Sequence, residues 1–354
     1  EAHNLYGLMM NKAGFEGLKK AHPDARPWLL TRSGWAGVQR YAWNWTADSD
    51  SSWEMLQQTI PALLNLTLSG LYFSGSDIGG FNGHPDRELY IRWFQLAAFT
   101  PFFRLHYATS APPREPWEYD QEVISIIRQL LILRYRLMPY LYTLAYQAAQ
   151  DGTPMIRPMV WTTPDNPQVY SIDDQFFLGD IVLVAPVLTP GIQKRSVWLP
   201  IGEWVDFWTQ QKYCGPGSIT IDTNLEQIPL LIKCGHILPL ADENVLHLLV
   251  FLPSTPSQSA QEKPDELYTD DGDGYGALRK DTFLLNVNDD GFEIKRSYTG
   301  EFTWPYESIK LNFIGRPITT IFVDGVQATL QGNALSVTDF ELIQGVTIAD
   351  RSEQ

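Results

Sequence analysis

Residues 71–81 read LYFSGSDIGGF, and this stretch determines the fold class. Its apolar and aromatic start predicts a short buried strand, and the two adjacent glycines that follow Asp77 predict the turn after that strand. A helical pattern follows from about residue 87 to residue 99. The same order of strand, polar turn and helix recurs on both sides of this stretch, which is typical of parallel strands joined by helices.

Four units of this kind are predicted within residues 1–150. The predicted strands lie near residues 28–31, 41–46, 70–74 and 102–106. The predicted helical segments are one that ends near residue 20 and three others over about 52–64, 87–99 and 120–147. A closed TIM barrel needs eight such units and about 250 residues. The sequence therefore predicts an α/β fold in which residues 1–150 form half of a (β/α)8 barrel.

After Asp151-Gly152 the pattern changes to short strands that Pro and Gly separate. Such a pattern is typical of antiparallel sandwiches. The predicted strands lie near 155–161, 180–187, 195–199, 218–221 and 230–240, and a second strand-rich segment continues to about residue 350. We therefore predict two all-β sandwich domains, over residues 151–240 and 241–354.

The distribution of charge excludes some classes of partner. Lys and Arg number 26 and Asp and Glu number 41, so the net charge is −15. Residues 1–150 are balanced, with 13 basic and 13 acidic side chains, and the acidic excess lies in the β segment. The absence of a basic stripe argues against nucleic acid and against an anionic membrane surface as partners. No apolar run reaches the roughly 18 residues of a membrane span.

The two cysteines carry little information about function. Cys214 and Cys234 are too few for a disulfide framework. We expect two free thiols, with Cys234 inside an apolar strand.

Three carboxylates stand at the ends of predicted strands, where parallel α/β folds place their sites. Asp48 follows the Trp-rich strand at 41–46, and an apolar wall of indole would favour the protonated form that a general acid needs. Asp50 is better explained as a cap of the helix that begins near Ser52. Asp77 lies in the glycine-rich turn after its strand.

Arg32 and His106 also end predicted strands, and both side chains can hydrogen-bond hydroxyl groups. The turn at 75–81 matches neither a dinucleotide-binding fingerprint nor a P-loop. No His, Cys, Asp or Glu cluster has metal-ligand spacing, and the acidic turn at 268–274 fails the calcium-loop pattern. We therefore expect no cofactor and no metal.

Together these motifs resemble glycoside hydrolase family 31, the α-glucosidase family. The resemblance is dense to about residue 240 and thinner beyond, and its motifs follow one another in family order. The matching strings are HNLYG (3–7), LTRS (30–33), AGVQRY (36–41), WTAD (45–48), SSWE (51–54), GSDIGGF (75–81), ELYIRWFQ (88–95), TPFFRLH (100–106), LRYRLMPYLYTL (133–144), GD (179–180), APV (185–187) and GHILPL (235–240).

The resemblance implies roles for particular residues. Asp48 matches the general acid/base. The residues that match substrate-binding positions around the sugar at the cleavage point are Arg32, Trp45, Asp77, Phe81 and His106. One departure from the family pattern is Ala47, where the family usually has Gly.

The resemblance also implies that residues 1–150 are the second half of the barrel. In this family the nucleophilic aspartate lies on an earlier strand, just before the His-Asn motif that begins here at His3. The chain opens at Glu1 without a Met, which we interpret as a cut in a longer protein. The N-terminal half of the same protein is therefore an expected partner, and this chain alone is expected to be inactive.

The activity that the resemblance implies is retaining hydrolysis of terminal α-linked glucose from oligosaccharides by double displacement. Within the family, α-xylosidase and α-glucosyltransferase remain alternatives. A non-catalytic carbohydrate-binding or regulatory subunit is the alternative from another class. The glycosylation sequons at Asn44 and Asn65 bear on localisation: a glycan on Asn44 would crowd the pocket, which favours a cytoplasmic protein.

Overall fold

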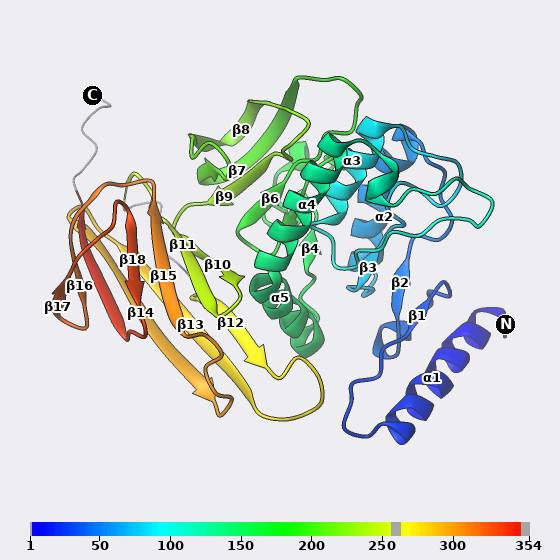
Figure 1. Ribbon diagram of the computed structural model, residues 1–354, viewed down its shortest axis with the longest axis horizontal. Helices are drawn as coiled ribbons and strands as arrows, with labels where there is room; N and C mark the ends of the chain where they lie inside the picture. Colours follow the sequence, from blue (N-terminus) through cyan, green and yellow to red (C-terminus); the bar gives the residue numbers. More distant parts are fainter. Residues whose placement is uncertain (1, 256–262, 348–354) are drawn as a thin grey trace.

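A computed structural model describes residues 2–255 and 263–347 (Figure 1). In the barrel segment three short parallel strands pair in chain order: β1 (Leu30–Thr31), β2 (Trp43–Trp45) and β3 (Ser74–Gly75). The first three helices are α1 (His3–Ala21), α2 (Trp53–Leu68) and α3 (Arg87–Ala97). Parallel strands joined by helical connections confirm the predicted α/β class.

The predicted strand at 102–106 is not a regular strand. Its backbone follows β3, where the Phe102 N–H donates to the Ser74 carbonyl at 3.3 Å. A single parallel bridge then joins Asp77 to Arg104, and the Ile78 N–H donates to the Arg104 carbonyl at 3.0 Å. The prediction of a regular strand was therefore wrong, although the segment lies where a fourth parallel strand would run.

The predicted long helix at 120–147 is two helices, α4 (Gln121–Arg136) and α5 (Met138–Asp151). Asp120 caps α4 by accepting a bond from the Val123 N–H at 3.0 Å. Leu137 ends α4 and begins α5, because Pro139 has no N–H to continue the bonding of α4.

The proximal β sheet has the strand order β4-β5-β6-β9-β7-β8. Its strands are β4 (Ile156–Arg157), β5 (Phe176–Leu178), β6 (Val182–Val184), β7 (Lys194–Asp206), β8 (Lys212–Asp222) and β9 (Leu230–Lys233). The predicted strand at 155–161 ends early, because Pro158 is followed by the 3-10 turn Met159–Trp161. The register of β7 against β8 shifts between Leu199 and Gly202, beyond which β7 also pairs with β9.

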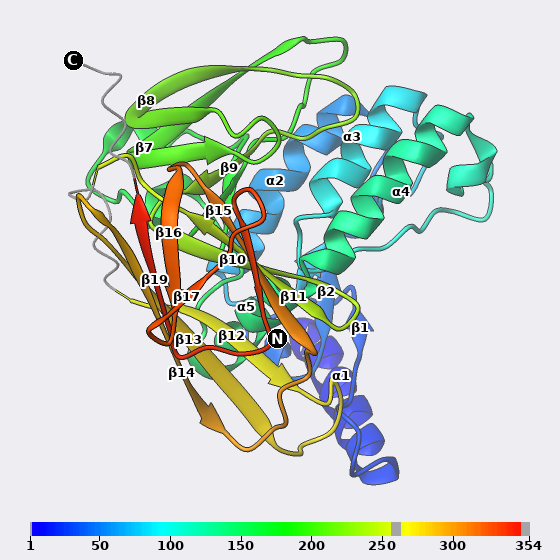
Figure 2. The same ribbon diagram turned by 60° about the vertical axis from the view of Figure 1, so that its left-hand side comes forward.

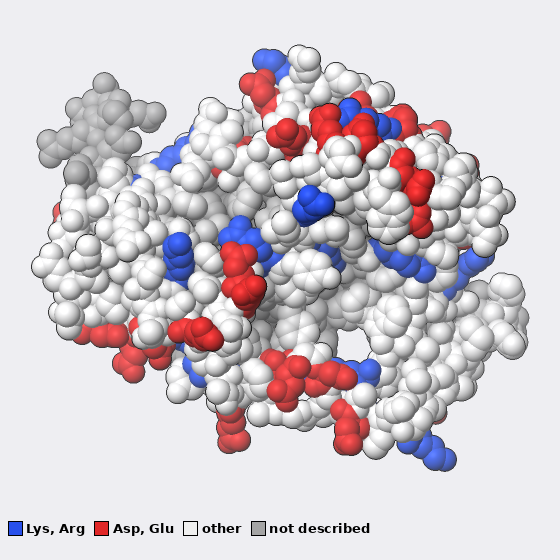
Figure 3. All heavy atoms as spheres, viewed as in Figure 1, with Lys and Arg blue, Asp and Glu red and all other residues white. Residues whose placement is uncertain are grey.

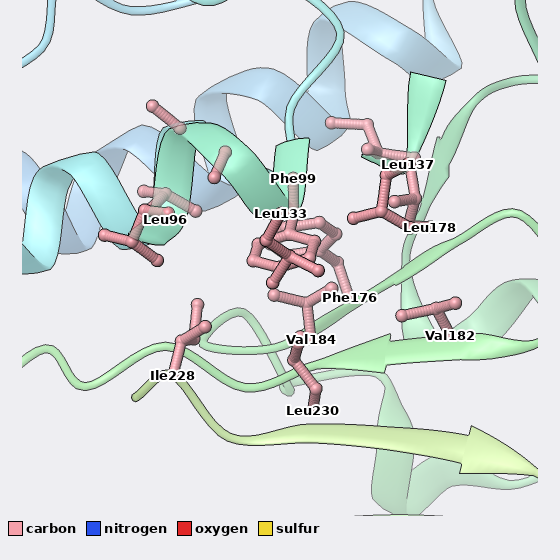
Figure 4. Close-up of a cluster of buried hydrophobic side chains, with 14 of the residues drawn as sticks. Leu96, Phe99, Leu133, Leu137, Phe176, Leu178, Val182, Val184, Ile228 and Leu230 are labelled. Carbon is pink, nitrogen blue, oxygen red and sulfur yellow. The ribbon is translucent and has the colours of Figure 1, made fainter. Parts of the chain in front are cut away.

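Apolar side chains cover both faces of this sheet. One face packs against helices α3 and α4 of the barrel segment, as Figure 4 shows. The labelled side chains are Leu96, Phe99, Leu133 and Leu137 from the helical side and Phe176, Leu178, Val182, Val184, Ile228 and Leu230 from the sheet side. The opposite face forms a second core that contains Phe177, Leu183, Val197 and Trp204. Both faces of this sheet are therefore buried, one of them against the helices of the barrel segment.

The predicted strand at 230–240 is two strands in different sheets. After β9 the chain turns at Gly235, whose φ of 83° is in the left-handed region, and β10 (His236–Asp242) begins the distal domain. Cys234 therefore lies buried in the connection rather than in a strand, and Cys214 is exposed on β8. Both thiols are free, as the sequence predicts.

The distal domain stacks two sheets face to face (Figure 2). One sheet contains, in order, β10, β11 (Val245–Phe251), β15 (Ser308–Ile314) and β18 (Ala334–Val337). The other contains β12 (Asp265–Asp270), β13 (Leu278–Val287), β14 (Gly291–Gly300), β19 (Leu342–Thr347), β16 (Ile318–Val323) and β17 (Val326–Ala328). This sandwich confirms the predicted distal class, although residues 256–262 and 348–354 of the predicted domain lie outside the described residues.

Among the helices of the described residues, none is long and apolar enough to cross a membrane.

Candidate active site

The candidate site lies at the carboxyl-terminal ends of β1, β2 and β3. Backbone and side-chain bonds align these strand ends. The buried amide of Asn44 donates to the Thr31 carbonyl at 3.0 Å, which ties β2 to β1. The Thr46 N–H donates to the Gly75 carbonyl at 3.0 Å, which ties β2 to β3. Because the strands are parallel, the residues that follow them meet at one edge.

Asp48 follows β2 and is the candidate acid/base. Its side chain is 39% exposed, and its Oδ1 lies 3.7 Å from the Nη2 of Arg32, which follows β1. The described residues thus set a cation beside this carboxylate, where the sequence predicted an apolar indole wall. Ala47 immediately before it has φ 61°, in the left-handed region. Glycine, which the resemblance to glycoside hydrolase family 31 leads us to expect at position 47, would adopt this conformation without a Cβ clash.

Asp77 follows β3 and is fully buried. Its Oδ1 accepts a bond from the Arg104 Nε at 3.0 Å and a second bond from the Arg104 Nη2. Its Oδ2 is buried and has no hydrogen-bond partner among the described residues. Burial raises the pKa of Asp77 above its ordinary value, the nearby Arg104 and His106 side chains oppose this rise, and Asp48 adds to it. These interactions place His106 and Asp48 in the electrostatic surroundings of Asp77.

Aromatic rings connect the charged groups. The guanidinium of Arg104 lies 4.8 Å from the centre of the Trp45 ring, and that of Arg32 lies 5.9 Å from it. The rings of Phe81 and His106 lie 5.4 Å apart. Five of the six residues that the sequence selected therefore form two contact groups, and Asp77 is the sixth. Arg32, Trp45 and Asp48 form one, Phe81 and His106 form the other, and Arg104 links the first group to Asp77.

The glycine-rich turn after β3 is fixed to the loop that carries Asp48. The Phe81 N–H donates to the Ser49 carbonyl at 2.7 Å. The side chain of buried Arg114 donates to the Gly79 carbonyl at 3.0 Å, and that of Ser51 donates to the same oxygen at 2.6 Å. Gly80 has φ 81°, and a Cβ there would come within 2.7 Å of the Asp50 backbone. Only glycine permits this close approach.

The predicted cap at Asp50 was wrong. Ser52 is the cap of α2, because its side chain accepts a bond from the Met55 N–H at 3.2 Å. Asp50 instead takes part in a backbone bridge with Asn82, which helps to join the same two loops.

Two arginines that hold the site in place were missed in the sequence analysis. Arg104 bonds Asp77, and Arg114 bonds the turn at Gly79. Arg104 stands two residues before His106, so it shares that residue's face of an extended segment. A buried carboxylate at Asp77 needs a cation, and this alternation was the available signal. Arg114 lies in a proline-rich loop far from the turn in sequence, and no local pattern indicates its partner.

The described residues contain no group of three or more His, Cys, Asp or Glu side chains that could hold a metal ion. The chemistry available at this site is therefore built from carboxylates, guanidinium groups, imidazole and aromatic rings.

Comparison with known proteins identifies the family. Residues 1–144 match the model of the glycosyl hydrolases family 31 TIM-barrel domain, and residues 152–238 match that of the glycosyl hydrolase family 31 C-terminal domain. Alpha-glucosidase 2 of Bacillus thermoamyloliquefaciens is 43% identical over 242 residues, which are 68% of this chain and 31% of that protein. Human neutral alpha-glucosidase AB is 37% identical over 299 residues, 80% of this chain and 31% of that protein.

Solved structures agree with the sequence relatives. A GH31 dextranase of Flavobacterium johnsoniae complexed with glucose has a TM-score of 0.87 at 27% identity, covering 98% of this chain and 49% of that one. A GH31 alpha-xylosidase of Xanthomonas citri has a TM-score of 0.80 at 29% identity, covering 94% and 39%. The chain spans about a third of the length of the curated relatives it matches. With its partial barrel and both matched domains, the chain belongs to glycoside hydrolase family 31.

Proposed function

We propose that this chain supplies the acid/base half of a retaining glycoside hydrolase that removes terminal α-linked glucose from oligosaccharides. The observation that supports this most directly is the meeting of Asp48, Arg32 and the buried Asp77 at one edge of parallel strands. The curated relatives are named as alpha-glucosidases, which favours glucose as the sugar.

Retention requires two carboxyl groups about 5–5.5 Å apart. In the proposed mechanism Asp48 gives its proton to the glycosidic oxygen as the bond to the anomeric carbon breaks. A nucleophilic aspartate, which the family resemblance assigns to a position before His3, forms an ester to that carbon. Asp48 then takes a proton from water, whose oxygen attacks the same carbon and releases the aspartate.

Asp77 has a separate proposed task. Arg104 holds one carboxylate oxygen, so the unpartnered Oδ2 is the atom available to accept a bond from a sugar hydroxyl. A hydroxyl near the reacting carbon is bound more tightly as the ring flattens in the transition state. Asp77 and His106 therefore contribute to turnover as well as to affinity.

Two alternatives within the family share this geometry. The likeness to a GH31 alpha-xylosidase keeps xylosidase activity open as a second candidate. Glucosyl transfer uses the same first step and differs only in the acceptor. A non-catalytic carbohydrate-binding subunit is disfavoured, because Asp48, Arg32, Asp77 and His106 are all present and lie together.

The test is Asp48→Asn in the complete enzyme, assayed on an α-linked disaccharide and on an aryl α-glucoside with a good leaving group. We expect the disaccharide rate to fall by about 10²–10⁴, the typical contribution of general acid–base catalysis. The first step on the aryl glucoside should fall less, because its leaving group needs less protonation.

The matched control is Asp50→Asn, two residues away, where we expect a far smaller loss because the Asp50 backbone rather than its carboxylate joins the loops. Equal losses at the two positions would contradict the assignment of Asp48.

A further inference from the structure

Arg26 joins the barrel segment to the distal β domain. It lies between α1 and β1, and its side chain and backbone reach the acidic turn between β12 and β13. Its N–H donates to the Asp273 Oδ1 at 2.8 Å, and its Nε donates to the Gly274 carbonyl at 2.6 Å. Its Nη1 donates to the Tyr142 hydroxyl at 2.6 Å, and its Nη2 pairs with the Asp270 carboxylate.

These contacts form a closed network across three segments. The Tyr142 hydroxyl, on α5, donates in turn to the Asp270 Oδ1 at 2.7 Å. Asp270 also accepts bonds from the Tyr268 hydroxyl and the Gly272 N–H, both at 2.7 Å, and its side chain is only 3% exposed. Burial would raise the pKa of Asp270, but the bonds from Arg26, Tyr268 and Tyr142 lower it below its ordinary value.

Besides the Arg26 network, other contacts hold this segment, among them a bond from the Asn11 side chain to the Thr31 hydroxyl at 3.1 Å. Figure 1 shows α1 standing apart from the body of the molecule, and only Gly7 and Asn11 of this helix are buried. In the space-filling view an opening lies between α5 and the segment that leads into β1, and acidic and basic side chains lie along its lower rim (Figure 3). β1 has two residues and pairs with β2 at Leu30 and Thr31, so this ladder alone holds it weakly.

The anchored segment leads directly to the candidate site. Arg32, which faces Asp48, follows Arg26 by six positions. Between them, Trp28 packs edge-on against Trp43 at 6.2 Å, and the Leu29 carbonyl accepts a bond from the Trp43 N–H at 2.8 Å. Displacement of the anchored end would therefore be transmitted to the strand that presents Arg32.

We propose that Arg26 is a positioning residue: through it, the acidic turn of the distal domain fixes the segment that presents Arg32 to Asp48. This role rests on the proposed function for its catalytic consequence. The acidic turn does not have a calcium-loop pattern. Its Asp270 carboxylate is instead paired with the guanidinium of Arg26.

The first test follows hydrogen exchange of the backbone amides of residues 28–33 in the complete enzyme. Arg26→Ala should accelerate exchange there about tenfold, because a local opening becomes easier when its anchor is removed. Asp270→Asn, which keeps the side-chain volume, should act in the same direction and replaces Arg26→Ala if that variant fails to fold. Asp271→Asn is the matched control: it changes an exposed carboxylate of the same turn, which is not a partner of Arg26, and exchange should stay as in the wild type.

The second test measures hydrolysis of an aryl α-glucoside in the Arg26→Ala, Arg32→Ala and doubly substituted enzymes. We expect Arg26→Ala to lower kcat/KM about tenfold, which is the order of loss that a small misplacement of a site residue produces. In the Arg32→Ala background it should cause no further loss, because the group it positions is gone.

Two results would overturn the proposal: unchanged exchange at residues 28–33 in both Arg26→Ala and Asp270→Asn, or an undiminished effect of Arg26→Ala in the Arg32→Ala background. If the complete enzyme did not hydrolyse α-glucosides, the proposed function would fail, while the exchange measurement would still decide whether the acidic turn holds this segment.

Discussion

Two fully buried aspartates, one in the barrel segment and one in the distal domain, are paired with arginine in different ways. Asp281 in the distal sandwich has both oxygens occupied, by Arg279 at 2.8 and 3.1 Å and by Arg296 at 3.0 Å. Asp77 in the barrel segment has one oxygen bound to Arg104 and the other without a partner among the described residues. A complete network stabilises a fold, whereas a buried oxygen left open marks a place where a ligand can bind.

The aromatic surroundings follow the same division. In the distal domain the guanidinium groups of Arg279 and Arg296 lie 3.6 Å from the Tyr298 ring centre and 4.1 Å from that of Trp304, so each cation is enclosed. At the candidate site Arg32 is 63% exposed on its side chain, and Arg104 is 23% exposed. The barrel cluster thus keeps accessible groups that the distal cluster does not.

The largest expected effect is that of Asp281→Ala on stability. Removing Asp281 from this buried ion cluster leaves the Arg279 guanidinium without its paired carboxylate and leaves Arg296 with Asp339 alone, which costs about 3–5 kcal/mol. Chemical denaturation of the complete protein, followed by a probe in the distal domain, measures this loss. A cost below about 1 kcal/mol would show that the cluster is not a stabilising network and would remove the contrast with Asp77.

Asp77→Asn should show the opposite profile. We expect kcat/KM to fall about 10- to 100-fold, because an amide replaces the carboxylate that accepts the sugar hydroxyl. Stability should stay within about 1 kcal/mol, since the burial of this charge is unfavourable and Arg104 is near enough to solvent to be hydrated. Normal kinetics with a large loss of stability would assign Asp77 to the same structural class as Asp281.

The pH dependence sharpens the comparison with a third carboxylate, Asp270. Its pKa is lowered from 3.8 in the folded state, so its stabilisation is present above about pH 4 and is lost as the pH falls through the lowered value. The pKa of Asp77 is raised from 3.8, so its ionisation weakens the fold as the pH rises above that value. Thermal unfolding midpoints against pH should therefore converge in acid for the wild type and Asp270→Asn.

For the wild type and Asp77→Asn the same measurement should converge in acid and separate as the pH rises, with the wild type losing stability relative to the variant. Parallel curves for both pairs would show that neither carboxylate has a perturbed titration.

The smallest expected effect is that of Ala47→Gly. A left-handed conformation costs an L-residue about 1–2 kcal/mol, and the greater freedom of glycine in the unfolded chain offsets part of the gain. We expect a net stabilisation of less than about 1 kcal/mol, seen as a small rise in the unfolding midpoint. Ala36 is an exposed loop residue that is not among the residues with positive φ. Ala36→Gly should therefore lower the unfolding midpoint, because it adds freedom to the unfolded chain without relieving strain.

Much of the candidate site was predictable because parallel strands collect their carboxyl ends at one edge. Arg32, Asp48 and Asp77 each follow a predicted strand, and the structure brings them to that edge. Arg104 was missed although its alternation with His106 was an available signal. Arg114 was missed because its partner Gly79 lies 35 residues away in sequence and no local pattern encodes that contact.

The extents of elements were less predictable than their presence. The apolar run at 230–240 predicts a single strand, although its two halves join different sheets. Gly235 was the available signal within it, and Pro139 was the corresponding signal in the helix at 120–147. Each lies where the structure breaks the predicted element.

The turn at Gly235 is the point at which the distal domains of two family members could be exchanged by recombination. A chimera joined at residue 240, where the apolar run ends, would leave most of β10 attached to the wrong parent, and five of its seven register pairs with β11, those of residues 236–240, would have to be made across a recombined boundary. A crossover between Cys234 and Gly235 transfers β10 and β11 together and preserves that hairpin. Recombination libraries drawn from this family should therefore be richest in folded members when the junction falls at this single peptide bond.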